Sequence, residues 1–294
     1  IHDSSYEAIP IRILPNRPPK IIGLIHSNKN GATIRSIERS DRQDLFIRKE
    51  NMLDATDGDY VVAQSIFNTH REARIIERLG AEGEPHIESL LVLKSKNVPI
   101  IFDAETTALA KSKTVPELGT RRDFRETQFV TIDGHDARDF DDAVWAAPDT
   151  ASANLGGWKL RIAVADVAYY VQEGDALDKT ARLRGNSVYC PDRVVPMLPE
   201  ALSNGLCSLK PNENRACLVA CITIDAKGNI IKKNFVRGLM RSVARLTYEQ
   251  VQSAYDGIPD EKTGSLTNNV IKPLYGAFDV LNRARQERGT LELE

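Results

Sequence analysis

The first part of the chain alternates short apolar segments with turn-forming residues. Four such segments lie between residues 19 and 67 and read KIIGLIHS, NKNGATIRSIE, DLFIRKENM and DGDYVVAQSIF. Asn30-Gly31 is a typical hairpin turn, and Asp57-Gly58-Asp59 predicts a second tight turn before an apolar strand. About five short strands in roughly fifty residues are typical of a small OB-like β-barrel. We therefore predict such a barrel over residues 19–70.

The segments on either side of this barrel differ from it in composition and in hydrophobic periodicity. Residues 1–18 are rich in proline and are interpreted as a linker or as the tail of a preceding domain. Residues 71–127 show weaker periodicity and predict a connector, with a short amphipathic helix in REARIIERLG that ends at Gly80. From Gln128 onward, strand-like and helix-like segments alternate, which predicts a mixed α+β domain over residues 128–294. The final TLELE resembles the start of another strand, so we expect this domain to be incomplete.

Within the second domain, local signals predict several elements. KLRIAVADVAYYV predicts a buried strand, and DALDKTARLRG predicts a helix that ends at a glycine. A capping box begins the helix in LTYEQVQSAYDG, and apolar residues follow one face of the helix in IKPLYGAFDVLNRARQERG. The residues that define these signals are Gly185, the capping pair Thr247 and Gln250, and the helical face of Leu274, Phe278 and Leu281.

Composition narrows the class of protein without identifying it. The formal net charge of -2 does not indicate a polyanion partner, and no run of eighteen apolar residues or charged-then-apolar leader is present, so we expect a cytoplasmic protein with no membrane contact. The four cysteines lack CxxC spacing, and Cys217 and Cys221 fall on one face of an apolar strand, which favours core packing. Two local clusters are basic, IKKNFVRGLMRSVARL and KSKTVPELGTRRDFR, and each is interpreted either as a nucleic-acid contact or as a solvated face.

The strongest chemical signal is the run TIDGHDARDFDDAVWA, which holds five aspartates in ten residues. Carboxylates this close repel one another unless a cation neutralises them, and oxygen ligands favour Mg²⁺ or Mn²⁺. The spacing does not match a calcium loop, because no frame places glycine at position six with an acid at twelve. An exposed acidic turn is the alternative. Two divalent ions here could drive hydrolysis of a phosphodiester, with Asp141 and Asp142 pointing to opposite sides of extended backbone.

The same segments support a family resemblance. TIDGHDARDFDDAV, IAVADVAYYV, the stretch from LDKTARLRG to NENR, and RSVARLTYEQV resemble the catalytic domain of the ribonuclease II / ribonuclease R (RNB) family from about Phe129 to the end. The preceding barrel resembles the second cold-shock domain of that family. The resemblance implies processive, Mg²⁺-dependent hydrolysis of RNA from its 3′ end, with release of nucleoside 5′-monophosphates.

The resemblance also assigns candidate site residues. It implies a metal centre formed by Asp133, Asp139, Asp141 and Asp142, with Asp139 and Asp141 as the catalytic pair. Asp136 lies outside this set and is interpreted as a loop residue or as a support for the ligands, and His135 as a loop histidine instead of a general base. Tyr189 matches the family's tyrosine that stacks on the terminal nucleotides, and a packed core tyrosine is the alternative. Arg193 and Arg215 could contact phosphates, with structural ion pairs as the alternative.

The resemblance leaves three functional hypotheses. The first is a fragment of an exoribonuclease, because the family's catalytic domain continues past the residue that matches Glu294. We expect a monomer whose partners are the 3′ end of single-stranded RNA and the C-terminal part of the same protein. The second is a catalytically inactive RNA-binding protein of the same fold, against which the intact aspartates argue. The third is a nuclease that acts on DNA, which only the resemblance disfavours, since the acidic run does not distinguish ribose from deoxyribose.

Overall fold

The computed structural model describes residues 20–38, 44–66 and 71–290. The chain divides into two compact units, Ile1–Ile100 with Tyr189–Val194, and Ile101–Val188 with Val195–Glu294. Each unit is considered separately below. The predicted linker over residues 1–18 and most of the predicted final strand lie outside the described residues.

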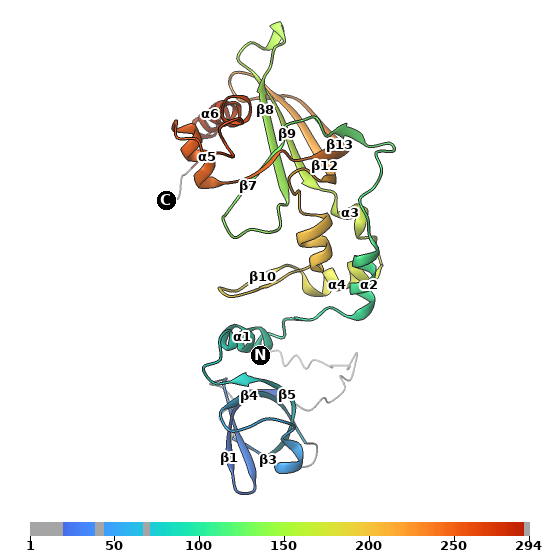
Figure 1. The fold of residues 1–294 in the computed structure, drawn as a ribbon, viewed down its shortest axis with the longest axis vertical. Helices are drawn as coiled ribbons and strands as arrows, with labels where there is room; N and C mark the ends of the chain where they lie inside the picture. Colours follow the sequence, from blue (N-terminus) through green and yellow to red (C-terminus); the bar gives the residue numbers. More distant parts are fainter. Residues whose placement is uncertain (1–19, 39–43, 67–70, 291–294) are drawn as a thin grey trace, which may run out of the picture. The chain divides into compact units, whose positions relative to one another are not determined.

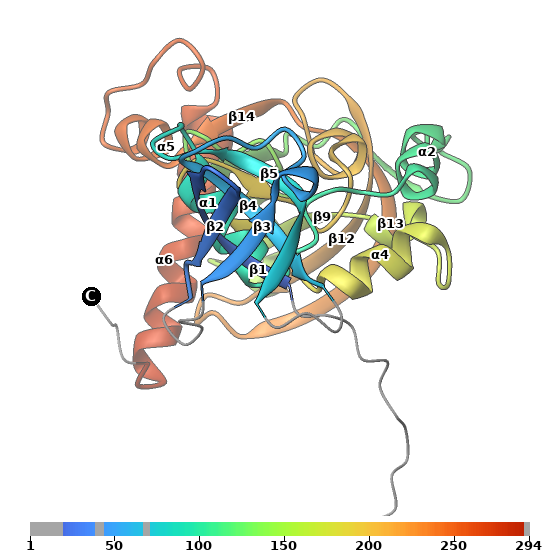
Figure 2. The ribbon, with the colours of Figure 1, turned by 90° about the horizontal axis from the view of Figure 1, so that it is seen from below.

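The first unit is built on a closed five-stranded barrel with the strand order β1-β2-β3-β5-β4 (Figures 1 and 2). Its strands are β1 (Lys20–Asn28), β2 (Gly31–Ser36), β3 (Leu45–Arg48), β4 (Asp59–Ser65) and β5 (Glu72–Ala81). A 3-10 turn, η1 (Lys49–Asn51), follows β3, and helix α1 (Ile87–Ser95) follows β5. The barrel interior holds Ile25, Ile34 and Ile47, all fully buried. The predicted barrel, its first four strands and the hairpin before Gly31 are confirmed.

The helix predicted in REARIIERLG is wrong, because these residues form strand β5. Ala73 and Ile75 alternate with exposed side chains and point into the barrel, which is the period of a strand. β5 pairs with β4 in the antiparallel sense and with β3 in the parallel sense, so it closes the barrel. The open edges of β3 and β4 outweigh the helix preference of Glu, Arg and Leu. The barrel thus extends beyond the predicted boundary at residue 70.

The second unit contains a seven-stranded sheet with the order β14-β7-β8-β9-β12-β13-β6. Its strands are β6 (Arg122–Phe124), β7 (Val130–Asp133), β8 (Asp142–Pro148), β9 (Trp158–Ala165), β12 (Asn214–Ile224), β13 (Ile230–Arg241) and β14 (Ala244–Thr247). The pairs β14–β7 and β13–β6 are parallel, and the others are antiparallel. The short strands β10 (Val188–Tyr189) and β11 (Val194–Val195) form a separate two-stranded sheet, of which Tyr189–Val194 belong to the first unit. The mixed α/β character predicted for this domain is confirmed.

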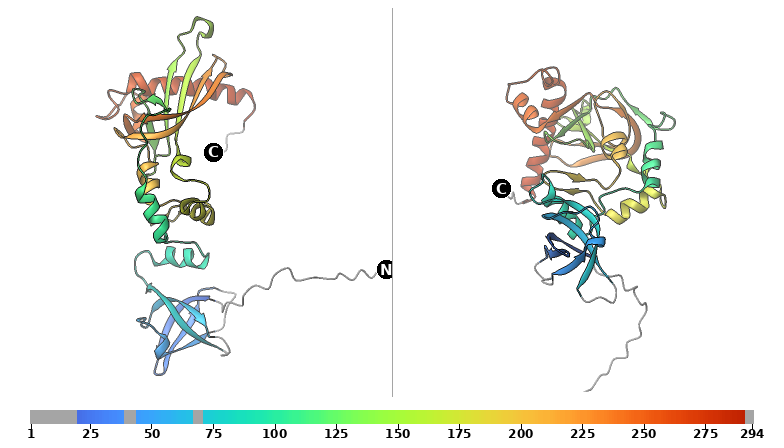
Figure 3. Two further views of the ribbon diagram at one scale, coloured as in Figure 1. Left: turned by 90° about the vertical axis from the view of Figure 1, so that its right-hand side faces the viewer. Right: turned by 60° about the horizontal axis from the view of Figure 1, so that its bottom comes forward.

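Helices cover both faces of the large sheet. They are α2 (Ala104–Ser112), α3 (Val167–Tyr170), α4 (Ala176–Arg184), α5 (Tyr248–Tyr255) and α6 (Lys272–Glu287), with the short turns η2 (Ser152–Asn154), η3 (Ala201–Leu206) and η4 (Thr267–Ile271), the last two being π-helical. One core contains Phe129 with Tyr170 and Leu202, and the other contains Val130 with Ile271. Because Phe129 and Val130 are consecutive, they face opposite sides of the sheet. Figures 1 and 3 show α5 and α6 on the side near β7 and β8.

The predicted helices of this unit are confirmed, and the predicted apolar face of α6 is buried only in part, since Leu274 packs against a core of the sheet. Helix α4 ends at Gly185, and the capping box of Thr247 and Gln250 begins α5. In α6, however, Phe278 is 55% exposed. The residues of α6 that are buried are Ala277, Val280 and Ala284. The helix approaches the sheet closely where Gly276 lies against Trp158, and only small side chains fit there.

Two further predictions concern the cysteines and the membrane. Cys217 is fully buried in β12 and Cys221 is half-buried in the same strand, and neither forms a disulfide, so core packing is confirmed. Among the helices in the described part of the chain, none has the length and apolar character needed to cross a membrane.

Candidate active site

The topology of the sheet brings the four predicted metal ligands to one end of two neighbouring strands. Asp133 is the last residue of β7 and Asp142 is the first residue of β8. These strands pair through Val130 and Val144, so residues 134–141 form the connecting loop and carry Asp139 and Asp141. We call residues 134–141 the acidic loop.

Contacts with neighbouring strands hold the two ends of the acidic loop. The backbone N–H of Ala165 donates to the carbonyl of Asp141 at 3.0 Å, which extends the pairing of β8 with β9. At the other end, the guanidinium of Arg245 donates to the carbonyls of Gly134 and His135 at 2.6 and 2.8 Å. Arg245 lies on β14, beside β7, and was predicted only as a member of a basic cluster.

The middle of the acidic loop is held by Ser208, which the sequence did not single out. The Ser208 hydroxyl donates to the carbonyl of Arg138 at 2.9 Å and accepts from the N–H of Phe140 at 3.1 Å. The segment PMLPEALSNGLCSL, which contains it, reads as scaffold in the sequence. No local signal marks this serine, because its partners lie about seventy residues away in the chain.

The carboxyl groups affect one another electrostatically. Burial raises the pKa of Asp141 above the usual range of a carboxyl group, and Asp139, Asp142 and Asp133 raise it further. Burial is also the main cause that raises the pKa of Asp133, with repulsion from Asp142 and Asp139 added and attraction to Arg245 opposing. Although the whole Asp141 residue is solvent-exposed, its carboxyl group lies among enough protein atoms to lose part of its hydration. The cluster therefore carries negative charge at an energetic cost.

The four aspartates offer the type of ligand that a hard divalent cation prefers, but they are not arranged tightly around one point. The donors are all carboxylate oxygens, which Mg²⁺ and Mn²⁺ prefer, and Asp133 Oδ2 is buried with no hydrogen-bond partner. Across residues 20–38, 44–66 and 71–290, however, no three His, Cys, Asp or Glu side chains are gathered tightly enough to hold a metal ion. Repulsion between the carboxylates opposes a tighter arrangement, and a bound cation would offset that repulsion.

The neighbouring residues His135 and Asp136 are exposed on the acidic loop. Asp136 Oδ1 lies 3.1 Å from His135 Nδ1, and both side chains are almost fully open to solvent. The two side chains interact with each other. Their position agrees with the prediction that they are loop residues.

Tyr189 and Arg193, both predicted to contact RNA, lie on the β10–β11 hairpin. Tyr189 is 67% exposed, so the alternative of a packed core tyrosine is wrong. The Arg193 side chain pairs with Asp192 at 3.0 Å and donates to the carbonyl of His86 at 2.8 Å. Its guanidinium thus has structural partners, as the alternative for this residue supposed.

Arg215 is placed as its structural alternative supposed. Its side chain on β12 is buried, with the residue only 5% exposed, and its Nε donates to the carbonyl of Ser208 at 2.8 Å. The remaining donors reach the Asn214 carbonyl and the Glu213 carboxylate. These contacts favour the structural alternative over contact with phosphate, because a buried and fully engaged guanidinium does not reach a ligand on the surface.

The basic residues of β13 do not form one cationic face of the strand. Lys232 and Lys233 are exposed on β13, and consecutive strand residues face opposite sides. Arg237 pairs with Asp166, and Arg241 donates to the Asn214 side chain. The exposure of the two lysines agrees with the alternative of a solvated strand face.

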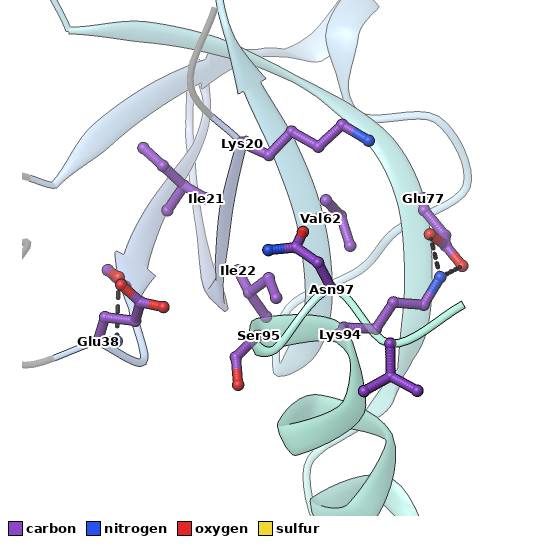
Figure 4. Close-up of a pocket in the computed structure, with 11 residues that line it drawn as sticks. Lys20, Ile21, Ile22, Glu38, Val62, Glu77, Lys94, Ser95 and Asn97 are labelled. Carbon is purple, nitrogen blue, oxygen red and sulfur yellow. Dashed lines mark hydrogen bonds and ion pairs between the residues drawn. The ribbon is translucent and has the colours of Figure 1, made fainter. Parts of the chain in front are cut away.

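A separate cavity of about 260 Å³ lies in the first unit, between β1, β4, β5 and the end of α1 (Figure 4). Figure 4 shows Lys94 directed toward Glu77, and its Nζ lies 2.6 and 2.7 Å from the two carboxylate oxygens. Lys20 and Glu38 also line the cavity, so its charges are mixed. This balance gives no reason to expect a polyanion there.

Comparison with known protein families agrees with both units. The RNB domain family model matches residues 121–294, and the cold shock domain model matches residues 34–103. The chain therefore belongs to the RNB family and carries a cold-shock domain ahead of its RNB domain.

Curated relatives of the chain are named ribonuclease R. The protein from Vibrio parahaemolyticus serotype O3:K6 is 36% identical over 294 residues, which cover 97% of this chain and 35% of the relative. The protein from Escherichia coli K12 is 35% identical over 298 residues, covering 98% and 36%. The chain thus spans about a third of the length of these relatives.

Solved structures share the fold. Mycoplasma genitalium RNase R in complex with double-stranded RNA has a TM-score of 0.85 at 23% identity, with 98% of this chain and 51% of that chain covered. Yeast Ssd1, described as a pseudonuclease, has a TM-score of 0.64 at 17% identity, covering 92% and 34%. These similarities establish the fold alone, and the fold occurs in a nuclease and in a pseudonuclease.

Proposed function

We propose that the chain is part of a hydrolytic exoribonuclease that degrades RNA processively from its 3′ end to nucleoside 5′-monophosphates, with Mg²⁺ or Mn²⁺ as cofactor. The observation that carries this proposal is the convergence of Asp133, Asp139, Asp141 and Asp142 at one end of β7 and β8 in an RNB domain. A protein that only bound RNA would gain nothing from four carboxylates that repel one another. These carboxylates would also repel the phosphates of the RNA.

In this proposal the four carboxylates would hold the cation, with Asp139 and Asp141 as the catalytic pair. A divalent ion held there would supply an activated water and neutralise the leaving oxygen of a phosphodiester. The four aspartates place their negative charge at one end of β7 and β8. Arg245 holds the start of the acidic loop and offsets part of the charge on Asp133.

The RNA-binding part of the proposal rests mainly on Tyr189. Its exposed ring offers a stacking surface to a terminal base of any identity, because every base has a π-face. Arg193 stays a weaker candidate, since it would have to leave Asp192 to contact a phosphate. The proposed partner is the 3′ end of single-stranded RNA, with the protein acting as a cytoplasmic monomer together with the remaining C-terminal part of a longer enzyme.

The alternative is an inactive RNA-binding protein of the same fold, and the yeast pseudonuclease of similar fold makes this a concrete possibility to test. The decisive experiment uses single-stranded RNA and DNA of one sequence, labelled at the 3′ or 5′ end. Each is incubated with the chain in Mg²⁺ or in EDTA. We expect monophosphates from the RNA 3′ end only, and no product in EDTA.

Two matched variants sharpen this experiment. Asp141→Asn should reduce the rate of release by at least about a hundredfold, because it removes a charge from the proposed metal centre. Asp136→Asn makes the same chemical change on an exposed position of the same loop and should cleave like the wild type. If the chain binds RNA but cleaves none, the assay is repeated with the C-terminal portion of a ribonuclease R added. Binding without cleavage in both cases supports the inactive alternative.

A further inference from the structure

Ser208 occupies an unusual position relative to Asp139. The residue is fully buried between the π-helical turn η3 and strand β12. Its hydroxyl donates to the carbonyl of Arg138 and accepts from the N–H of Phe140. A single hydroxyl therefore binds the peptide groups on both sides of Asp139. The next residue, Leu209, adds a third bond from its N–H to the Phe140 carbonyl at 2.8 Å.

The backbone of Ser208 is held in turn by the core of the sheet. Arg215 Nε, on β12, donates to the Ser208 carbonyl at 2.8 Å. The same guanidinium donates to the Asn214 carbonyl at 2.9 Å and pairs with Glu213. A continuous series of hydrogen bonds thus runs from β12 through Ser208 to the acidic loop. This series connects the irregular segment that carries Asp139 to a rigid strand.

We propose that Ser208, supported by Arg215, is a positioning residue that fixes Asp139 in the metal centre. This inference rests on the proposed function, because it assumes that Asp139 is a metal ligand. Backbone groups that lose their partner in a loop adopt new directions or take up water, and the carboxylate between them moves accordingly. Ser208 touches neither the cation nor the RNA in this proposal and acts only through the backbone of the acidic loop.

The first test measures the loop without any metal. Amide hydrogen exchange of peptides that cover residues 134–142 is compared between the wild type and Ser208→Ala in EDTA. We expect faster exchange at Phe140 and its neighbours in the variant. The matched control is Ser242→Ala, which removes another buried serine hydroxyl from the same unit, one that donates to the carbonyls of Phe129 and Ala244 and not to the acidic loop. The control should leave exchange in the loop unchanged.

The second test measures the metal directly. Mn²⁺ binding to the full chain is followed by the electron paramagnetic resonance signal of the free ion. Ser208→Ala should raise the apparent Kd about tenfold, the usual effect of removing a group that orients a ligand, and Ser242→Ala should not. Ser208→Cys keeps the size of the side chain with weaker bonds and should fall between the two. This variant also keeps the proposal testable if Ser208→Ala does not fold.

The outcomes separate this inference from the proposed function. Wild-type exchange and wild-type Mn²⁺ affinity in both Ser208 variants would overturn the positioning role. A wild-type chain that binds Mn²⁺ no better than Asp141→Asn would overturn the metal centre itself. Faster exchange of the loop in Ser208→Ala, together with an unchanged Mn²⁺ affinity, would show a structural role only and would also contradict the proposal.

Discussion

At the scale of single residues, Tyr189 shows what exposure can decide. A lone tyrosine in a strand is most often packed in a core, yet this ring is two-thirds exposed on a short hairpin. An exposed aromatic ring does not contribute the hydrophobic stabilisation that a buried ring provides. Stacking on an RNA base, as proposed above, would give this ring a physical role.

We therefore predict that Tyr189→Ala weakens binding of single-stranded RNA by about 1–3 kcal/mol, the usual contribution of stacking on one base. Tyr189→Phe keeps the ring and should bind nearly as tightly as the wild type. Binding is measured by fluorescence anisotropy of labelled RNA in EDTA, so that cleavage does not interfere. Phe235→Ala, which removes a similarly exposed ring from β13, serves as the control. An equal loss in both variants would contradict a specific role for Tyr189.

Residues that act through the backbone were beyond the reach of sequence reasoning. The aspartates are close together in the chain, so their repulsion, and with it the prediction of a cation site, follows from spacing alone. Ser208 and Arg245 lie far from the acidic loop in the chain, and their hydrogen bonds exist only because the sheet places their segments beside it. The two alternatives for Arg215 stayed open for a similar reason, since a basic residue in a sequence carries no sign of its burial.

At the scale of elements, α6 shows how close packing selects small side chains. A Cβ at Gly276 would lie 2.5 Å from Cη2 of Trp158, well inside van der Waals contact. In an exposed helix, replacing glycine by alanine usually stabilises by about 1 kcal/mol. Here the steric conflict should reverse the sign, because a Cβ at this distance forces either α6 or the indole ring of Trp158 to shift.

We predict that Gly276→Ala lowers the free energy of unfolding of the second unit by about 1–3 kcal/mol. Urea unfolding followed by tryptophan fluorescence measures this directly, because both tryptophans, Trp145 and Trp158, belong to that unit. Gln286→Ala, on an exposed position of the same helix, should change stability little. A stabilised Gly276→Ala variant would show that α6 does not press against Trp158.

At the scale of the whole molecule, the barrel unit holds a buried charge whose partners Arg78 and Thr56 lie in the same unit. In the barrel, Asp59 is buried and accepts from Arg78 Nε at 2.7 Å and from the Thr56 N–H at 2.7 Å. The hydrogen bond from Arg78 lowers the pKa of Asp59 to about 2. Because the folded pKa lies below its ordinary value, the contribution to stability is complete above the ordinary pKa and is lost as the pH falls toward 2.

We therefore predict that acidification from pH 5 to about pH 2.5 destabilises the barrel in the wild type and less so in Asp59→Asn. At neutral pH the variant should already be less stable by about 1–3 kcal/mol, since Arg78 loses its charged partner. Pulse proteolysis in urea, with barrel fragments identified by mass, measures the first unit, while tryptophan fluorescence measures the second. Asp44→Asn, on an exposed position, is the control. A tryptophan transition that moves with Asp59→Asn would instead show that the two units unfold together.

The features that the sequence determined by itself depend on interactions between residues close together in the chain. Turns, helix caps and strand periods depend on residues a few positions apart, so the hairpin before Gly31, the capping box at Thr247 and the end of α4 at Gly185 were all predictable. The acidic run is equally local, and its repulsion identifies it as a candidate cation site in any fold.

Only the tertiary structure decided features that depend on distant partners. REARIIERLG became β5 because the open edges of β3 and β4 offered backbone hydrogen bonds that no local helix could outweigh. The buried face of α6 was set by the close contact of Gly276 with Trp158, and the buried position of Arg215 by the Ser208 carbonyl that it supports. In each case the free energy comes from groups brought together by folding, and spacing along the chain does not record them.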